Sequence, residues 1–484
     1  MALKFGTSGL RGEVKEMTDR ECYGATLAFL KYLVETNNLN PGDEIAIAGD
    51  LRPSTDSILE IINTAIIDSG YQTINCGKVP TPTLSFFAFQ RNIPSIMVTG
   101  SHIPFDMNGI KFNMPFGEVL KSDEPRIIEL KEKTISELEN SNKFEGENLK
   151  NKKALPNEIP TAKEVYKKRY LDSLPEQCFK DKKIVFYGHS SVGRDLLPEI
   201  LEDLGAEVIK VNYTDKFTPI DTEAIRKEDL ELAKDWVTEH QPDVVFSADG
   251  DSDRPMIFDE KGQFIRGDLL GVLSSIFLKA NSVSLPVSSN TALEKTKLFK
   301  NITRTKIGSP YVIEGMNEAI KNGIIRVVSY EANGGFLTAD EIDIDGRILK
   351  PLPTRDALLP LIAILMLSID KGKAISEITS ELLPQRFVYS SSIKGIPTEN
   401  SLGFIEKLKN TTDFSKITGD FKLPALIEKI DFTDGARMYL GNDDIVHLRP
   451  SGNAPELRCY SESDTEEKAK ILTEKTLELA KEKL

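Results

Sequence analysis

Cysteine is scarce in this chain, and the positions of the few that occur exclude the common cysteine-based scaffolds. Four cysteines are spread over 484 residues, and no two of them form a Cys-x-x-Cys pair. Zinc sites and the disulfide frameworks of small secreted domains both need cysteines at short, regular spacings. We therefore expect packed free thiols at the four positions, which are Cys22, Cys76, Cys178 and Cys459.

Long hydrophobic runs are also absent from the sequence. A membrane-spanning helix needs roughly 20 consecutive apolar residues, and no stretch of the chain approaches that length. The first residues, Met-Ala-Leu-Lys-Phe-Gly, have neither the apolar core nor the small-residue cleavage site of a secretory signal. The sequence thus predicts a cytoplasmic protein without a membrane partner.

Positive charge is in deficit, because 61 Lys and Arg face 75 Asp and Glu, which gives a net charge of −14. A protein that binds nucleic acid needs a basic face, so we expect no nucleic-acid partner. An anionic substrate would have to be held by local groups of Arg and Lys that overcome the acidic surroundings. The loops are where such groups should be found.

What the chain does contain is an alternation of Val/Ile-rich runs with amphipathic stretches. Near-continuous apolar strands alternating with helices are typical of parallel or mixed sheets covered on both faces. Ligands of such sheets bind beyond the carboxyl ends of the strands. The expected strands are 44–48, 71–76, 95–99, 183–187, 207–211, 242–249, 302–307 and 324–330, and the expected helices are 55–68, 194–204, 268–279, 311–321 and 464–482.

Two changes in character divide this pattern. The segment 139–153 is polar, and a second break lies near 370–386, after which the segments become shorter. At roughly 100–200 residues per domain, the length allows three or four domains. We predict three consecutive α/β domains with mixed sheets, 1–150, 155–258 and 259–375, followed by an α+β domain, 384–484.

The loop after the strand at 95–99 carries the first chemically suggestive group. It reads TGSHIPFDMNGIKF and places Ser101, His102 and Lys111 close together in the sequence. A serine can act as a nucleophile where the developing charge is stabilised, and a lysine can serve as a base if its pKa is lowered. The alternative is an ordinary turn, since Ser and Asn-Gly are common turn residues.

The second loop, ADGDSDRPM, alternates three carboxylates directly after a strand. Asp249, Asp251 and Asp253 would repel one another unless a cation lay among them, and their oxygen atoms suit Mg²⁺ or Ca²⁺. An EF-hand, with Glu260 at position 12, is excluded because Arg254 stands where the loop needs Gly. We predict a metal site, and we expect this polar loop to be exposed in a cleft.

The third loop, LRPSGNAPELRCYSES, offers cations and a flexible backbone that suit a phosphate. Arginine binds phosphate through two parallel N–H groups, and Gly lets backbone amides converge. An ordinary Pro-Ser-Gly turn with solvated arginines is the alternative. The candidate residues are Arg449, Ser451, Gly452, Asn453 and Arg458.

Two further loops give weaker signals. KFGTSGLRG is Gly-rich and contains Arg11, and it could line a phosphate site or be a mobile end. SYEANGGF follows a strand and places Glu331 and Asn333 where they could grip sugar hydroxyls, although it is also an unremarkable turn. Taken together, the loops come about one per predicted domain and describe phosphoryl transfer on a phosphosugar, with four domains facing one cleft.

These motifs resemble those of a known family, the α-D-phosphohexomutases. The segments GTSGLRG, TGSHIPFDMNGIK, DGDSDRP, EANGG and RPSGNAPELR are similar to the family's motifs in order and spacing, over essentially the whole chain. The resemblance implies a heart-shaped arrangement of four domains around a central cleft. It also implies a substrate that is a hexose phosphate, and a monomer or simple dimer.

The resemblance further implies a role for each motif. Ser101 would carry a phosphoryl group in the loop that also holds His102, and an oxygen of this phosphoserine would bind Mg²⁺ together with Asp249, Asp251 and Asp253. Arg254 would support the phosphoserine, and Arg11 and Lys111 would assist proton transfer. Glu331 and Asn333 would bind the sugar, and the non-reacting phosphate would lie on Arg449, Ser451, Gly452, Asn453 and Arg458.

In the reaction that the resemblance implies, the phosphoserine phosphorylates the 6-hydroxyl of a hexose 1-phosphate. The 1,6-bisphosphate then turns end for end and returns its 1-phosphate to Ser101. We expect a phosphomannomutase that serves nucleotide-sugar synthesis. Phosphoglucomutase or a dual enzyme is the next alternative, and phosphoglucosamine mutase follows.

The sequence departs from the family pattern at four motifs. Ser252 of the metal loop replaces the common Gly or Ala, the phosphate loop reads Ser-Gly-Asn-Ala-Pro where Ser-Gly-Thr-Glu-Pro is common, and two further changes are larger. The nucleophile loop, commonly Ala-Ser-His-Asn-Pro, has Gly100 and Ile103 at the first and fourth positions. The sugar loop, often Glu-Met-Ser-Gly-His, ends at Gly335 and lacks the histidine. The change in the sugar loop shifts the expected proton transfer toward Lys111 and Arg11.

Two readings from other classes remain. A metal-dependent phosphatase would use the same serine and aspartates but would need no separate phosphate loop. A non-catalytic sugar-phosphate binder is disfavoured by the presence of Ser101, the three aspartates and Arg254.

Overall fold

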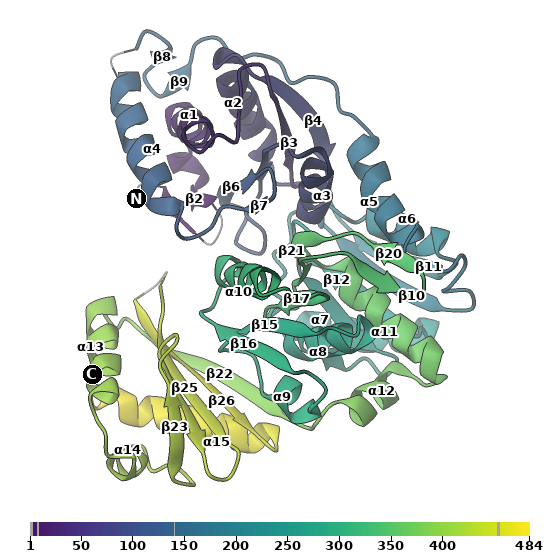
Figure 1. The fold of residues 1–484 in the computed structure, drawn as a ribbon, viewed down its shortest axis with the longest axis vertical. Helices are drawn as coiled ribbons and strands as arrows, with labels where there is room; N and C mark the ends of the chain where they lie inside the picture. The colour runs from purple at the N-terminus through teal and green to yellow at the C-terminus, as the bar shows by residue number, and fades with distance from the viewer. Residues whose placement is uncertain (1–2, 7–8, 140, 453–454) are drawn as a thin grey trace.

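The computed structural model describes residues 3–6, 9–139, 141–452 and 455–484. Four units follow one another along the chain in an arc, from purple at the N-terminus to yellow at the C-terminus (Figure 1). The arc brings the last unit back beneath the first, and the two termini lie on the same side of the molecule. The predicted fold class, three α/β units with mixed sheets and a final α+β unit, is confirmed.

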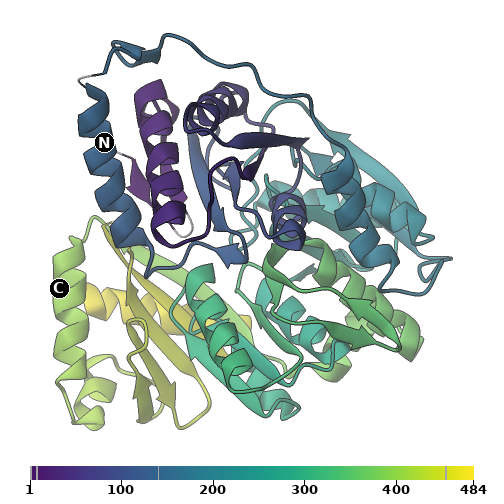
Figure 2. The same ribbon diagram turned by 45° about the horizontal axis from the view of Figure 1, so that its top comes forward.

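The first unit is a mixed sheet in the order β1-β2-β6-β5-β3-β4, with β7 paired to β6. Ile45 and Ile47 pack beneath α1 and α2, whereas Ala46 and Ala48 face α3, so both faces of β3 are buried. Helices α1 and α4 lie side by side over the first face (Figure 2). The elements are β1 Lys4–Phe5, β2 Gly9–Glu13, the 3-10 turn Val14–Glu16, α1 Asp19–Glu35, β3 Glu44–Gly49, α2 Thr55–Asp68, β4 Gln72–Lys78, α3 Thr81–Arg91, β5 Ser95–Val98, β6 Met107–Met114, β7 Gly117–Glu118 and α4 Glu124–Glu139.

The second unit has a five-stranded sheet in the order β11-β10-β12-β13-β14. Phe186 of β10 faces α6, and its neighbour Tyr187 faces Trp236 of α7, so the two helices cover opposite faces. The elements are α5 Thr161–Leu171, β10 Lys183–His189, α6 Leu196–Asp203, β11 Glu207–Tyr213, α7 Lys227–His240, β12 Val244–Ala248, β13 Pro255–Asp259 and β14 Phe264–Ile265.

The third unit repeats this plan with the order β16-β15-β17-β18-β21. Helices α8 and α11 join one core cluster, while Val312 and Met316 of α10 pack on the other face against Val327 and Leu337. The elements are α8 Gly267–Phe277, β15 Ser282–Pro286, α9 Ala292–Thr296, β16 Asn301–Thr305, α10 Ser309–Lys321, β17 Val327–Tyr330, β18 Phe336–Thr338, β19 Ile342–Ile344, β20 Arg347–Leu349, β21 Leu352–Asp356 and α11 Leu358–Lys371.

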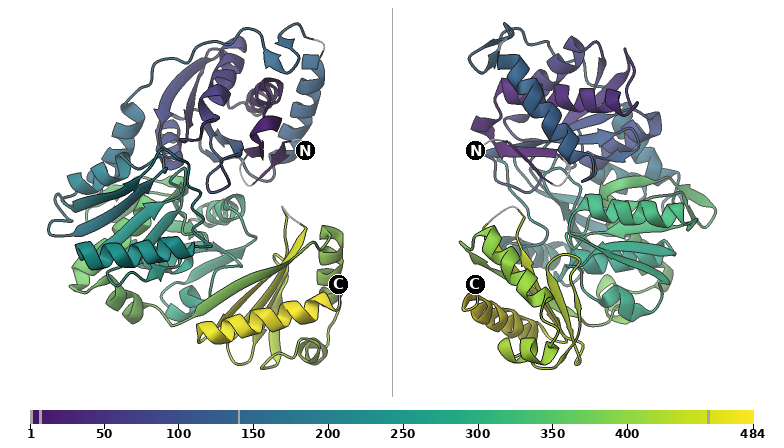
Figure 3. Two further views of the ribbon diagram at one scale, coloured as in Figure 1. Left: turned by 180° about the vertical axis from the view of Figure 1, so that it is seen from behind. Right: turned by 60° about the vertical axis from the view of Figure 1, so that its left-hand side comes forward.

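The last unit is a fully antiparallel sheet in the order β22-β26-β25-β24-β23. Its apolar residues pack with those of α13, α14 and α15, and α15 runs along the sheet in the view from behind (Figure 3). The elements are β22 Phe387–Lys394, α13 Thr398–Lys409, α14 Phe414–Asp420, β23 Ile427–Asp431, β24 Ala436–Leu440, β25 Ile445–Pro450, β26 Glu456–Ser463 and α15 Glu466–Lys481.

One topological feature recurs in the three α/β units and positions the candidate site. In each sheet an outer strand of the parallel trio (β5, β12 or β17) is followed by an antiparallel neighbour (β6, β13 or β18). The loops between these strand pairs are 99–106, 249–254 and 331–335, and they hold Ser101, the three aspartates and Glu331 respectively. Three predicted site loops therefore occupy equivalent places in three copies of one plan.

The two predicted linker segments contain more structure than their composition indicated. Within 139–153, strands β8 Phe144–Glu145 and β9 Asn148–Leu149 pair, and Phe144 and Leu149 join the core of the first unit. Within 370–386, α12 Ile375–Leu382 buries Ile375 and Ile378 against the third unit. The second sheet also continues to Ile265, beyond the predicted domain limit at 258.

In the described parts of the chain, no helix combines the length and the apolar character needed to cross a membrane.

Candidate active site

Ser101 lies at the carboxyl end of β5 and points at the aspartate loop of the second unit. Its hydroxyl donates to Asp249 Oδ2 at 2.6 Å, and His102 Nδ1 lies 3.3 Å from the Ser101 hydroxyl oxygen. The backbone of Ser101 is left-handed, with φ of 53°. Only 1 % of Ser101 is exposed, so its chemistry depends on the groups packed around it.

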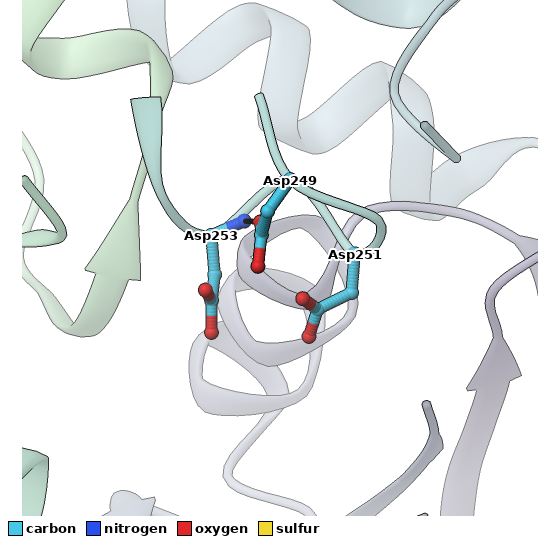
Figure 4. Close-up of side chains that lie close together, drawn as sticks. All are labelled: Asp249, Asp251 and Asp253. Atoms are coloured by element: carbon cyan, nitrogen blue, oxygen red, sulfur yellow. Dashed lines mark hydrogen bonds between the residues drawn. The ribbon is translucent and has the colours of Figure 1, made fainter. Parts of the chain in front are cut away.

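Asp249, Asp251 and Asp253 project from the β12–β13 loop toward one point (Figure 4). One carboxylate oxygen from each lies within 4.8 Å of the others. All three residues are completely buried, so the expectation that this loop is exposed was wrong. The loop turns directly from strand to strand, which agrees with the exclusion of an EF-hand. Gly250 allows the close contact with the serine loop, since a Cβ there would lie 2.6 Å from the Ser101 carbonyl oxygen.

Charge in the aspartate loop is unevenly balanced. Burial, followed by repulsion from Asp251 and Asp253, raises the pKa of Asp249 well above its usual range. Burial alone would also raise the pKa of Asp251, but the Lys111 ammonium, the Thr81 hydroxyl and the Arg355 guanidinium together lower that pKa. The pKa of Asp253 is lowered in the same way, chiefly by the Arg355 guanidinium.

The cations that balance the aspartates come from two other units. Lys111 of β6 lies 2.6 Å from Asp251 and 3.0 Å from Asp253, and Arg355 of β21 lies 3.0 Å from Asp253. The pKa of Lys111 is raised, because Asp251 and Asp253 outweigh the effect of burial. Lys111 is therefore a cation in this arrangement and not a base.

The aspartate loop also fits a divalent cation. Within the described part of the chain, Asp251 Oδ1 and Asp253 Oδ1 are buried without a hydrogen-bond partner. Buried carboxylate oxygens are costly unless a donor or a cation satisfies them. An all-oxygen set of this kind suits Mg²⁺ better than a softer metal.

Further cations lie close to His102, the residue that follows Ser101. The charge on Arg254, together with burial and the charge on Arg11, lowers the pKa of His102 to about 2, which leaves this imidazole neutral. Burial and the charges on Arg254 and Arg355 lower the pKa of Arg11 to about 10. Arg254 Nε also lies 3.5 Å from Asp253 Oδ1. A group carrying two negative charges on Ser101 would meet positive charge here.

The predicted sugar loop is connected to the same centre. Arg355 Nη1 donates to Glu331 Oε2 at 3.0 Å, so one guanidinium links Glu331 to Asp253. Asn333 uses its side-chain oxygen to accept from the Gly335 amide at 2.9 Å, and its carbonyl accepts from Thr222 of the second unit. Glu331 thus adjoins the aspartates, whereas the Asn333 side-chain oxygen braces its own turn.

The predicted phosphate loop lines a polar cavity together with residues of the first and third units. Arg449 and Arg458 are directly opposite each other on β25 and β26. Like charges in this position are destabilising unless negative charge lies nearby. Carboxylates supply part of this negative charge, since Asp434 lies 2.9 Å from Arg449 and Glu456 lies 2.6 Å from Arg458.

The cavity at the two arginines measures about 490 Å³ and is lined from three units. Lys121 of the first unit and Lys306 of the third face it, together with Ser451 and Gly452 of the fourth. Asn453, also predicted to bind phosphate, lies outside the described residues.

Family models for the four domains of the phosphoglucomutase/phosphomannomutase proteins match in order along the chain. The alpha/beta/alpha domains I, II and III match residues 2–139, 168–262 and 267–386, and the C-terminal domain matches 405–479. A phosphomannomutase of Salmonella muenchen is 40% identical over 492 aligned residues, covering 100% of this chain and 96% of the relative. The chain belongs to the phosphoglucomutase/phosphomannomutase family.

Other members of this family agree over the full length. A phosphomannomutase of Sinorhizobium fredii is 36% identical over 473 residues, covering 98% of this chain and 97% of the relative. The crystal structure of a phosphoglucomutase/phosphomannomutase family protein from Burkholderia thailandensis superposes with a TM-score of 0.75 at 17% identity, covering 98% of this chain and 96% of that one. The resemblance to phosphohexomutases found in the sequence is confirmed.

Several residues of the site escaped the sequence analysis. Arg355 ends a strand of the third unit, and Thr81, which donates to Asp251 at 2.6 Å, begins α3. Lys121 and Lys306 lie in segments without a distinctive motif. Only Arg52, in the GDLRPS segment after β3, carried a positional signal, because it follows the carboxyl end of a parallel strand.

Proposed function

We propose that this family member is a cytoplasmic phosphomannomutase, which interconverts mannose 1-phosphate and mannose 6-phosphate through phosphorylated Ser101. The observation that carries the proposal is the Ser101 hydroxyl, held 2.6 Å from one of three clustered aspartates whose charges Lys111 and Arg355 balance. This geometry can hold a phosphoryl group, release it to a hydroxyl and take one back. The names of the relatives at 40% and 36% identity support mannose as the sugar.

Each site residue has a proposed part in this reaction. Asp249, Asp251 and Asp253, with a phosphoserine oxygen, would hold Mg²⁺. When bound, this cation neutralises charge on the transferring phosphoryl group. Arg254 and His102 would hold the phosphoserine in place, and Arg11 and Lys111 would assist proton movement at the reacting oxygens.

Substrate would span the space between the two charged regions. Arg449, Ser451, Gly452, Asn453 and Arg458 would bind the phosphate that does not react, while Glu331 and Asn333 would contact the sugar. The bond between Ser101 Oγ and phosphorus breaks as the sugar 6-oxygen bonds to phosphorus, giving a hexose 1,6-bisphosphate. After the bisphosphate reverses its orientation, Ser101 recovers a phosphoryl group from position 1. The protein contributes positioning and charge stabilisation.

A cavity lined by paired arginines favours a mutase over a phosphatase. Transfer to water needs only the serine and the metal, whereas a bisphosphate must be held at its second phosphate while the first reacts. We also propose the four domains predicted from the sequence, with the second extended to Ile265 at the end of its sheet, and, as the working assembly, a monomer or simple dimer.

The proposal is tested by a coupled assay of the purified protein with Mg²⁺ and a trace of glucose 1,6-bisphosphate. The kcat/KM values for mannose 1-phosphate, glucose 1-phosphate and glucosamine 1-phosphate are compared, with Ser101→Ala prepared in parallel to detect contaminating mutase. A clear preference for mannose 1-phosphate is expected. Equal rates for mannose and glucose would make the protein a dual mutase. Release of free phosphate without any 6-phosphate product would replace the mutase by a phosphatase.

A further inference from the structure

Arg52 has no motif-based role, yet its guanidinium lies under the loop that carries Ser101. The side chain is fully buried and pairs with Asp50 at 3.2 Å, both residues belonging to the GDLRPS segment after β3. The loop approaches very closely, since a Cβ at Gly100 would lie 2.5 Å from the guanidinium carbon. A side chain at position 100 would therefore force the Arg52 guanidinium to shift.

Every N–H group of this guanidinium has an acceptor. Nε donates to Asp50, and the two terminal nitrogens donate to four backbone carbonyl oxygens of the serine loop. Those carbonyls belong to Ser101 at 2.9 Å, Ile103 at 2.5 Å, Pro104 at 2.5 Å and Met107 at 2.9 Å. A lysine offers three donors at a single point and cannot reproduce this planar set.

The other partners of Asp50 extend the same support to the start of the loop. Asp50 Oδ2 accepts from the Thr99 hydroxyl at 2.8 Å and from the Gly100 amide at 3.3 Å, and the Thr99 hydroxyl accepts from the Ser101 amide at 2.8 Å. Residues on both sides of the serine are therefore tied to one buried ion pair. This support holds the left-handed backbone of Ser101, a conformation that costs energy in a residue with a Cβ.

An aromatic ring of the second unit covers one face of the Arg52 guanidinium. The ring of Phe217, in the β11–α7 loop, lies 4.0 Å from the Arg52 guanidinium carbon, and it also lies 3.4 Å from the position of a Cβ at Gly250. A cation over an aromatic face is attracted to it, most strongly where water is excluded. Phe217 thus packs between Arg52, which supports the serine loop, and Gly250 of the aspartate loop.

We propose that Arg52, covered by Phe217, is a positioning residue that sets the Ser101 oxygen against the aspartates for phosphoryl transfer. The proposal rests on the proposed function, in which Ser101 carries the phosphoryl group. Arg52 acts through the backbone of the loop and does not itself touch the reacting atoms. A small displacement of the serine would slow transfer while leaving the distant phosphate loop, and hence much of the substrate binding, unchanged.

The test compares Arg52→Lys with Arg91→Lys in the full-length protein. Arg91 is a matched control because it also pairs with a carboxylate, that of Glu44, and lies 5.4 Å from the ring centroid of Phe87, but on the surface of the same unit. For Arg52→Lys we expect kcat to fall about 100-fold, KM to change less than about threefold, and amide hydrogen exchange over residues 101–107 to become faster. Arg91→Lys should leave all three unchanged.

Phe217→Leu keeps every hydrogen bond of Arg52 and removes only the aromatic face, so it decides the question if Arg52→Lys does not fold. The kcat of Phe217→Leu should fall about 5–10-fold, and amide hydrogen exchange over residues 101–107 should become faster. If Arg52→Lys folds and keeps the wild-type kcat, the proposal is overturned. If Arg52→Lys does not fold, a wild-type kcat in Phe217→Leu overturns it instead. A change in KM without a change in kcat would also overturn it. If the wild-type protein itself forms no 6-phosphate product, the proposed function fails, and unchanged exchange over 101–107 would separately refute the support of the loop.

Discussion

At the scale of single residues, burial decides what the charged side chains can do. Asp249, Asp251 and Asp253 are completely buried, so their charges depend on neighbours and not on water. Lys111 and Arg355 reach them from other units, and each contacts more than one carboxylate. The site is an interlocked set of charges in which any single substitution leaves a partner unbalanced.

Replacing Ser101 tests the phosphoryl carrier directly. Ser101→Ala removes the oxygen that would bond to phosphorus, so turnover should fall at least about 1000-fold. The initial rate with mannose 1-phosphate measures this. Ser57→Ala, an exposed serine in α2 of the same unit, serves as the control and should keep wild-type activity. Normal turnover by Ser101→Ala would rule out the phosphoserine mechanism.

Replacing Asp251 tests the metal site. Mg²⁺ bound among the aspartates should stabilise the folded protein, by about 2.7 kcal/mol at a concentration 100 times its Kd. Asp251→Asn removes one charge of the three, so we expect a weaker rise in Tm with Mg²⁺ and lower activity. Differential scanning fluorimetry with Mg²⁺ or EDTA measures the first effect. An identical Tm response in wild type and variant would place the cation elsewhere.

At the scale of elements, successive side chains along the strands of the last unit alternate between the core and the opposite face of the sheet. In β25, Val446 and Leu448 enter the core, while His447 and Arg449 face the opposite side. The same alternation in β26 puts Arg458 and Tyr460 opposite Arg449 and His447. The register of one strand pair thus creates the two-arginine surface on which the proposed phosphate site depends.

His447 makes the stability of this unit depend on pH. Burial and the charge on Arg437 lower the pKa of His447 to about 3, and its Nε2 lies 2.6 Å from the Asp434 carbonyl oxygen. The unfolded chain takes up this proton near pH 6.5 and the folded protein only near pH 3, so stability is full above pH 6.5 and declines as pH falls between the two values. The expected loss between pH 7 and pH 5 is about 1–2 kcal/mol.

The measurement is the urea midpoint of the wild type and of His447→Gln at pH 7 and pH 5. Gln can still donate to the Asp434 carbonyl but does not titrate, so the variant should lose less stability at pH 5. His240→Gln, a substitution at the end of α7 in the second unit, is the control. Equal losses in wild type and His447→Gln would contradict the assignment.

At the scale of the whole molecule, the third and fourth units are joined by a buried charged contact. Glu462 of β26 lies 2.7 Å from Arg386 and 3.6 Å from Arg437, and it accepts from the Thr291 amide and hydroxyl in the third unit. Arg437 in turn donates to the Val287 carbonyl of the third unit. This contact orients the face bearing Arg449 and Arg458 toward the rest of the arc.

Glu462→Gln should loosen the last unit. Removing one partner of a buried ion pair costs about 3–5 kcal/mol, because the remaining charges are left unpaired. We expect a larger radius of gyration in X-ray scattering, faster proteolysis near residues 383–387, and a lower kcat/KM. Glu428→Gln, at an exposed position of β23, provides the matched control. An unchanged radius and cleavage rate would mean that other contacts hold the unit in place.

Much of this protein follows from the sequence alone. Apolar periodicity predicted the helix 55–68 at its observed limits, because both faces of its sheet are buried and the pattern is strong. The positions of the loops after strand ends predicted that Ser101 and the three aspartates belong to one site, and the structure brings these residues together. Composition excluded disulfides as a framework, and the structure has four free cysteines.

Tertiary structure alone decided the rest. Thr81 and Arg355 lie in segments without a motif, and they become part of the site only because three units meet there. Arg52 reaches the serine loop through packing within the first unit. The aspartate loop looked like an exposed polar turn, yet packing against the first and third units buries it completely. Local pattern determines which strands and loops form, whereas burial and charge balance arise between segments distant in the sequence.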